Sequence, residues 1–118
     1  MQYSLDKNEK YALISLHEQK LNTLISAELK SELLIINSQG YSNIILDLSD
    51  TQYCDSSGLS AVLVGNRVCR NSNGSFVITG LSDAVMKLIS ISQLEQVLVI
   101  TPTVTEAIDY IASNEIEK

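Results

Sequence analysis

Short apolar runs alternate with amphipathic segments along the chain, and this order constrains the fold more than any other feature. The runs have the length of buried strands, and the segments between them carry apolar residues at helical spacing. We expect strands at 11–16, 44–48, 76–79 and 97–100, and helices that begin near residues 24, 56, 83 and 104. Such alternation gives parallel neighbours with right-handed crossovers. The sequence therefore predicts one α/β domain over residues 1–118, with a mixed, mostly parallel β-sheet, about four helices and an N-terminal hairpin strand at Gln2–Leu5.

The core has to be built mainly from leucine, isoleucine and valine. Apolar residues make up 45% of the 118-residue chain, yet Trp is absent and Phe occurs once. A chain of this length can bury enough surface to fold without metals or disulfides. Residues in the apolar runs, or on the apolar stripe of a helix, should be buried. That set is Leu46, Leu48, Leu59, Leu63, Val77, Ile78, Ile89, Val97 and Val99.

A polar loop follows the run at 44–48 and leads into a predicted helix that opens on Asp55-Ser56-Ser57-Gly58. Unpaired N–H groups and the helix dipole favour an anion at a helix start, so a serine there is suited to carry a phosphate. The simpler interpretation is that these side chains only cap the helix. Gly58 argues for more than a cap, because glycine inside a helix costs about 1 kcal/mol relative to alanine. Its missing side chain would let the backbone of another protein approach the hydroxyls.

The sequence shows few of the features that nucleophilic or redox catalysis needs. The single histidine, His17, is far in sequence from both serines, and the surrounding motif is not a Gly-x-Ser-x-Gly elbow. Cys54 and Cys69 have no CxxC spacing, so they predict neither a zinc site nor a redox pair. We expect two buried or half-buried free thiols and no enzymatic activity.

Three carboxylates near the same loop leave two interpretations open. Asp47, Asp50 and Asp55 could form a magnesium pocket at the ends of strands, or they could make hydrogen bonds that stabilise turns. We favour the turns for Asp47 and Asp50, because Asp47 falls within the apolar run and Asp50 on the turn after it. No Gly-x-x-x-x-Gly-Lys loop is present to hold a nucleotide. We therefore expect no metal and no cofactor.

Charge and hydropathy limit the class of partner. The net charge is −6 and the eight basic residues are scattered, so direct nucleic-acid binding is not expected. There is no apolar run near 18 residues and no leader-like N-terminus, which predicts a cytoplasmic protein without membrane insertion. We expect a monomer or a weak dimer.

Residues 46–63 read LDLSDTQYCDSSGLSAVL, and this segment resembles the central motif of the STAS family, typified by bacterial anti-sigma factor antagonists. The likeness continues through the strand and Gly80-Leu81 turn at 75–81, the helix near 84–89 and the last strand and helix. The resemblance implies a STAS domain that binds an anti-sigma factor serine kinase while unphosphorylated, which frees a sigma factor. It also implies that the kinase ends this binding by phosphorylating the first serine of the motif, here Ser56.

The resemblance further implies which residues contact the partner. Asp55, Ser57 and Gly58 would lie at the kinase contact, and a second contact region would correspond to Gln19–Asn22. This second region lacks the glycine and the aspartate that the family has there. A partner contact through Asn22 therefore implies a divergent partner. Other STAS proteins are adaptors in membrane-associated, lipid ABC transporter type complexes without phosphorylation, and this is the alternative function. Nucleotide binding, reported for some STAS domains, is a further option from the resemblance.

Overall fold

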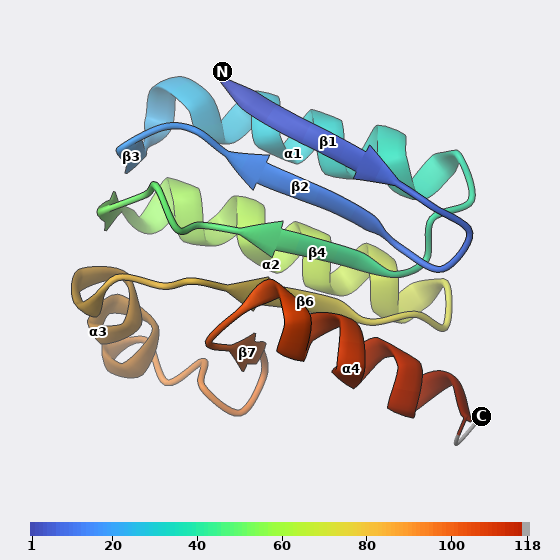
Figure 1. Ribbon diagram of the computed structural model, residues 1–118. Helices are drawn as coiled ribbons and strands as arrows, with labels where there is room; N and C mark the ends of the chain where they lie inside the picture. The colour runs from blue at the N-terminus through green and yellow to red at the C-terminus, as the bar shows by residue number, and fades with distance from the viewer. Residues whose placement is uncertain (117–118) are drawn as a thin grey trace.

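Five strands form the central sheet of the computed structural model, which describes residues 1–116 (Figure 1). In spatial order they are β1 (Tyr3–Lys7), β2 (Ala12–Leu16), β4 (Ile44–Asp47), β6 (Phe76–Thr79) and β7 (Val99–Thr101). The hairpin pair β1–β2 is antiparallel and the other neighbours are parallel. The predicted mixed, mostly parallel sheet is confirmed.

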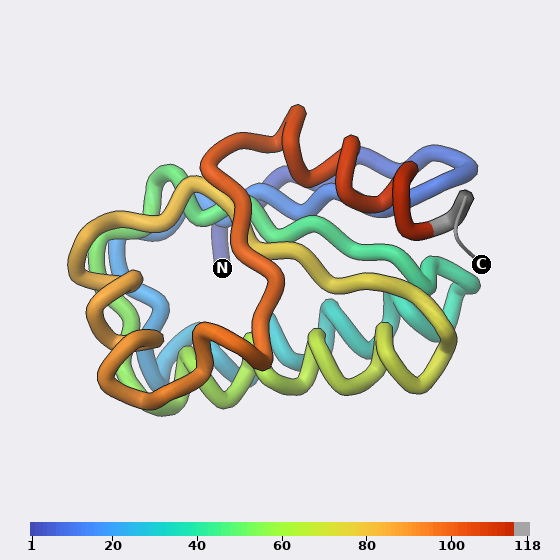
Figure 2. The backbone as a smooth tube through the Cα atoms, turned by 90° about the horizontal axis from the view of Figure 1, so that it is seen from below, coloured from blue at the N-terminus to red at the C-terminus, as the bar shows by residue number. Residues whose placement is uncertain are grey.

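In the described part of the chain, four helices pack around this sheet, as the sequence predicts. α1 (Thr23–Ser38) and α2 (Ser56–Asn71) cover one face, whereas α4 (Val104–Ile116) lies on the other (Figures 1 and 2). α3 (Asp83–Ile91) sits at the end of the sheet where the parallel strands finish, and α1 and α2 begin at that same end. Within residues 1–116, no helix has the length and apolar content needed to cross a bilayer.

A second, two-stranded sheet lies at this end of the molecule and was not predicted. β3 (Lys20–Leu21) and β5 (Tyr53–Cys54) pair in parallel. The carbonyl oxygen of Gln19 also accepts hydrogen bonds from the N–H groups of Gln52 at 2.8 Å and Tyr53 at 3.1 Å. This pairing ties the segment before α1 to the segment before α2.

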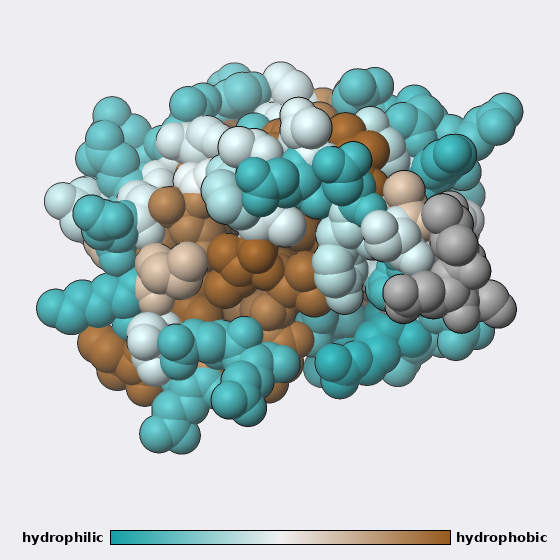
Figure 3. Space-filling view, turned by 60° about the horizontal axis from the view of Figure 1, so that its bottom comes forward, coloured by the Kyte–Doolittle hydropathy of each residue, from teal (hydrophilic) through white to brown (hydrophobic). Residues whose placement is uncertain are grey.

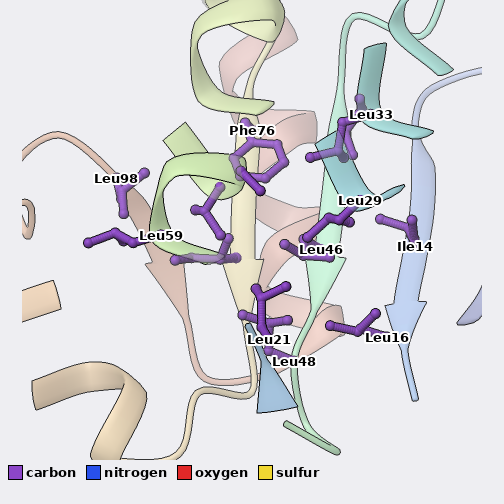
Figure 4. Close-up of a cluster of buried hydrophobic side chains, with 14 of the residues drawn as sticks. Ile14, Leu16, Leu21, Leu29, Leu33, Leu46, Leu48, Leu59, Phe76 and Leu98 are labelled. Carbon is purple, nitrogen blue, oxygen red and sulfur yellow. The ribbon is translucent and has the colours of Figure 1, made fainter. Parts of the chain in front are cut away.

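The main core fills the space between the sheet and the helix pair α1–α2 (Figure 4). Apolar side chains from β2, β4 and β6 meet those of both helices, and Leu21 of β3 joins them. A smaller cluster under α4 contains Ile45, Val77, Ala107 and Ile111. The prediction of burial is confirmed for Leu46, Leu48, Leu59, Val77, Ile78 and Ile89.

Three residues of the predicted core are not fully buried. Leu63 is half-buried, and so is Val99, because β7 is an edge strand with a neighbour on one side only. The prediction for Val97 is wrong, since this side chain is 38% exposed and β7 begins two residues later. The carbonyl oxygen of Leu94 accepts from the N–H groups of Val97 at 3.1 Å and Leu98 at 3.0 Å, which holds a turn that buries Leu98 instead.

Thr79, the last residue of β6, offers a stability test of the fold. Its side chain is fully buried, and its Oγ1 has no hydrogen-bond partner within residues 1–116. A buried polar group without a partner costs about 1–3 kcal/mol. We therefore expect Thr79→Val to raise the free energy of unfolding by about 1 kcal/mol, measured by circular dichroism during urea unfolding.

The matched control is Thr101→Val, at the position that pairs with Thr79 in the neighbouring strand. Oγ1 of Thr101 donates a hydrogen bond to the carbonyl oxygen of Thr103 at 2.9 Å. Losing this bond should lower stability by about 0.5–1 kcal/mol. Equal effects of the two substitutions would show that the hydroxyl of Thr79 is satisfied in solution.

Candidate functional site

Asp55 is the N-cap of α2. Its Oδ1 accepts a hydrogen bond from the backbone N–H of Gly58 at 2.9 Å and another from Oγ of Ser57 at 2.6 Å. The hydroxyl of Ser57, followed by the N–H of Gly58, holds the pKa of the Asp55 carboxyl below its usual range. The cap is therefore a carboxylate at neutral pH, and it weakens only as the pH falls through this lowered pKa.

The two serines of the motif have different surroundings. Ser56 is the first residue of α2, it is exposed, and its hydroxyl has no hydrogen-bond partner in the part of the chain that the structure describes. Ser57 is half-buried, and its Oγ lies 3.3 Å from Oγ1 of Thr23 in addition to its bond with Asp55. The Ser57 hydroxyl thus turns to two side chains, and the charged carboxylate of Asp55 is the nearer of them.

The start of α1 lies beside the start of α2. Asn22 is the N-cap of α1, and its Oδ1 accepts from the N–H of Leu24 at 3.0 Å. The contact between Thr23 and Ser57 and the β3–β5 pairing hold the two helix starts together. The structure thus brings the predicted contact regions, 19–22 and 55–58, to one end of the molecule.

Gly58 is needed for packing within the chain itself. The residue is buried, and a Cβ at this position would overlap the carbonyl oxygen of Leu21. The same Cβ would come within 2.7 Å of Cγ of Leu21 and 2.8 Å of Sγ of Cys54. The glycine therefore lets α2 seat directly against β3 and β5, a reason that the sequence does not reveal.

The start of α1 and the strand that leads into α2 each carry an exposed large apolar side chain, and the sequence predicts neither. Leu24 is 84% exposed at the start of α1, and Tyr53 is 57% exposed in β5. Leu24 could have been found, because it lies outside the apolar stripe formed by Ile25, Leu29 and Leu33. We call the exposed residues Leu24, Tyr53 and Ser56 the serine face.

His17 takes part in a separate polar chain. Its Nε2 lies 2.7 Å from Oγ of Ser4, and its Nδ1 lies 2.8 Å from Oδ2 of Asp50. This is the order of a Ser–His–Asp relay, although Ser4 is not the serine considered from the sequence. All three residues are exposed, with the side chains of His17 and Asp50 at 45% and 63%. Acyl transfer needs a water-excluding site with preorganised donors for an oxyanion, which such an exposed chain does not provide.

The remaining candidate groups have structural roles. Oδ1 of Asp47 accepts from the N–H of Ser49 at 3.0 Å, which confirms the turn interpretation for this residue, whereas Asp50 pairs with His17. Within residues 1–116, no group of three or more His, Cys, Asp and Glu side chains could hold a metal ion.

The two thiols are free, as expected. Burial, and then the charge of Asp55, raises the pKa of Cys54 to about 11, and burial raises the pKa of Cys69 to about 12. Both thiols stay protonated at neutral pH and are poor nucleophiles.

An apolar hollow of about 440 Å³ lies between α3 and the ends of β6 and β7. Leu81, Met86 and Ile100 line it, and Thr101 is its one polar side chain within the described residues. The space-filling view from this side shows apolar side chains gathered on the surface near α3 (Figure 3). None of the described residues that line the hollow is charged, so no group there would orient a polar substrate. The start of α2, with Ser56 and Ser57, remains the stronger candidate site.

Comparison with known proteins gives one family. The family model of the STAS domain matches residues 5–107. TM1081 of Thermotoga maritima has a TM-score of 0.83 at 22% identity, covering 93% of this chain and 94% of that chain. An anti-sigma factor antagonist from Mycobacterium paratuberculosis has a TM-score of 0.78 at 14% identity, covering 94% and 93%.

Two structures of SpoIIAA, an anti-sigma factor antagonist from Bacillus, are similar to this chain, one unphosphorylated and one phosphorylated. Its unphosphorylated form has a TM-score of 0.80 at 22% identity, covering 95% of this chain and 97% of that chain. Its phosphorylated form has a TM-score of 0.72 at 22% identity, covering 93% and 99%. At these identities the structural likeness establishes a shared fold.

Proposed function

The chain belongs to the STAS domain family, and we propose that it is a cytoplasmic anti-sigma factor antagonist that acts by phosphorylation-controlled partner switching. In this proposal the unmodified protein binds a serine kinase that also restrains a sigma factor, and binding frees the sigma factor. The kinase then phosphorylates Ser56 and the complex dissociates. The protein itself acts by binding rather than by catalysis.

The observation that carries the proposal is the difference between Ser56 and Ser57. A kinase needs a hydroxyl that can leave the protein surface and enter the kinase active site. Ser56 is exposed and makes no hydrogen bond within the described residues, whereas the hydroxyl of Ser57 is held by Asp55 and lies against Thr23. Ser56 can therefore reach a partner without breaking the cap of α2.

A phosphate on Ser56 would act on the partner contact and not on the fold. It would lie at the start of a 16-residue helix, where a negative charge is stabilised by about 0.3–1 kcal/mol. It would also add about −1.5 to −2 charges, with their hydration, at the end of the molecule that carries the exposed side chains of Leu24 and Tyr53. That SpoIIAA resembles this chain in both its unphosphorylated and phosphorylated forms supports a local switch.

The other predicted contact residues receive distinct roles in this proposal. Tyr53 is the main anchor, because tyrosine is one of the side chains that supply most of the energy of such interfaces. Leu24 adds apolar area to the same contact. Asn22 keeps its amide nitrogen for the partner while its oxygen caps α1. Asp55 and Ser57 fix the conformation of the start of α2. Gly58 allows α2 to pack closely against β3 and β5.

The test is affinity purification of the tagged protein from its native cells, followed by phosphosite mapping by mass spectrometry. We expect a small GHKL-type serine kinase to co-purify, and phosphate to be found on Ser56. Phosphate on Ser57 would show that the site is wrongly assigned. Recovery of a membrane ATPase assembly, without a kinase and with Ser56 unmodified, would replace this proposal with the adaptor function.

A further inference from the structure

A polar notch lies at the end of the molecule opposite the serine face. β6 begins at Phe76, but its neighbour β7 begins only at Val99, which pairs with Val77. The first residue of β6 therefore has no strand beside it at this edge of the sheet. α2 and α4 border the resulting notch from the two faces, and its volume is about 190 Å³.

The charge of the notch is set by Arg70 of α2. Among the described residues that line the notch, Arg70 is the one cation, and none is an aspartate or glutamate. Among the side chains that the structure describes, which run to residue 114, no carboxylate lies within 4.0 Å of its guanidinium group, although the chain as a whole has a net charge of −6. Arg70 therefore presents a fork of N–H donors that lacks an anionic partner.

Neutral polar groups and an apolar wall complete the notch. Asn66, one turn before Arg70 on α2, and Tyr110 of α4 line it and can donate hydrogen bonds. Asn114 donates from Nδ2 to Oγ of Ser75 at 2.8 Å, which fixes the α4 side against β6. Apolar atoms come from Val97, which is exposed in the turn before β7, and from the half-buried Val99 at the start of β7.

We propose that this notch binds a small branched-chain carboxylate. The carboxylate pairs with the guanidinium group of Arg70, whose planar fork matches two carboxylate oxygens. The alkyl group lies against Val97 and Val99, which explains the exposure of a valine that the sequence places in the core. A phosphate suits the notch less well, because a single cation cannot balance about −1.5 to −2 charges. This inference is independent of the proposed switch.

The test is an NMR titration of the intact protein with isovalerate at constant ionic strength. We expect saturable shifts of the side-chain signals of Arg70, Asn66 and Asn114. Arg70→Met should weaken binding more than about tenfold, because it removes a charge-assisted pair and keeps the apolar stem. Arg67→Met is the matched control, since Arg67 is exposed on the same helix and does not line the notch. It should leave the affinity unchanged.

Two further ligands make the result decisive. Isovaleramide has nearly the same shape without the charge, and it should bind more than about tenfold more weakly than isovalerate. Inorganic phosphate should also bind more weakly. Equal binding of the amide, equal effects of the two arginine substitutions, tighter binding of phosphate, or shifts confined to another part of the protein would each overturn the proposal.

Discussion

Replacement of Gly58 by alanine is expected to lower the free energy of unfolding by about 2 kcal/mol, although alanine is the better helix former. Helix propensity favours alanine by about 1 kcal/mol. The new Cβ, however, would overlap the backbone carbonyl oxygen of Leu21 and crowd Sγ of Cys54. A backbone atom in a sheet cannot rotate away, and overpacking of this kind costs about 3 kcal/mol, at the upper end of its usual range. The steric term therefore exceeds the gain in propensity.

The measurement is urea unfolding of Gly58→Ala, followed by circular dichroism. Ser60→Ala is the control, because Ser60 is exposed on the same helix and its replacement changes helix propensity without a clash. We expect a small gain in stability for the control and a clear loss for Gly58→Ala. A gain for both would show that β3 moves away from α2 at little cost, and that the close packing of the corner is not required.

The sequence predicts the sheet and the helices because their signals are local. The apolar stripe of α1 repeats at Ile25, Leu29, Leu33 and Ile36, and three of these four side chains are fully buried. The capping residues are equally local, since Asp55 accepts from the N–H of Gly58, three residues along the chain. Elements of this kind can be derived without knowing what packs on them.

The features that the sequence does not predict depend on neighbours far along the chain. β3 and β5 have two residues each, too few for any periodic signal, and they exist because they pair with each other across more than 30 residues. The same pairing explains Gly58, whose neighbours Leu21 and Cys54 come from these two strands. The relay through His17 and the notch around Arg70 likewise gather residues from separate elements.

The start of α2, with Ser56 and Ser57, has features of both kinds, some that the sequence predicts and one that it does not. Its sequence is sufficient to place Ser56 and Ser57 at the start of a helix, and the resemblance selects Ser56 as the phosphoacceptor. The sequence cannot show that Thr23, from another helix, lies against Ser57. This contact supplies a physical reason for choosing between two adjacent hydroxyls, because it leaves Ser56 as the one that is free to move.

Ser56→Asp is expected to weaken the complex with the co-purifying kinase by about 2 kcal/mol, which is roughly a thirtyfold rise in Kd. An aspartate at this position places a carboxylate in the proposed partner contact, where it has to lose hydration without gaining a partner. The fold should be unaffected, because Ser56 is exposed and a negative charge is favourable in the first turn of a helix. Isothermal titration calorimetry with the kinase measures the change.

Two control variants test whether the loss of affinity depends on the position of the negative charge or only on its presence. Ser56→Ala should bind the kinase as tightly as the unmodified protein and resist phosphorylation, because it removes the hydroxyl and adds no charge. Ser60→Asp places the same carboxylate one helical turn further along the exposed side of α2, and it should raise Kd much less than Ser56→Asp does. If the two aspartates weaken the complex equally, general electrostatic repulsion accounts for the effect. If Ser56→Asp binds as tightly as the unmodified protein, phosphorylation at this position cannot act as the switch.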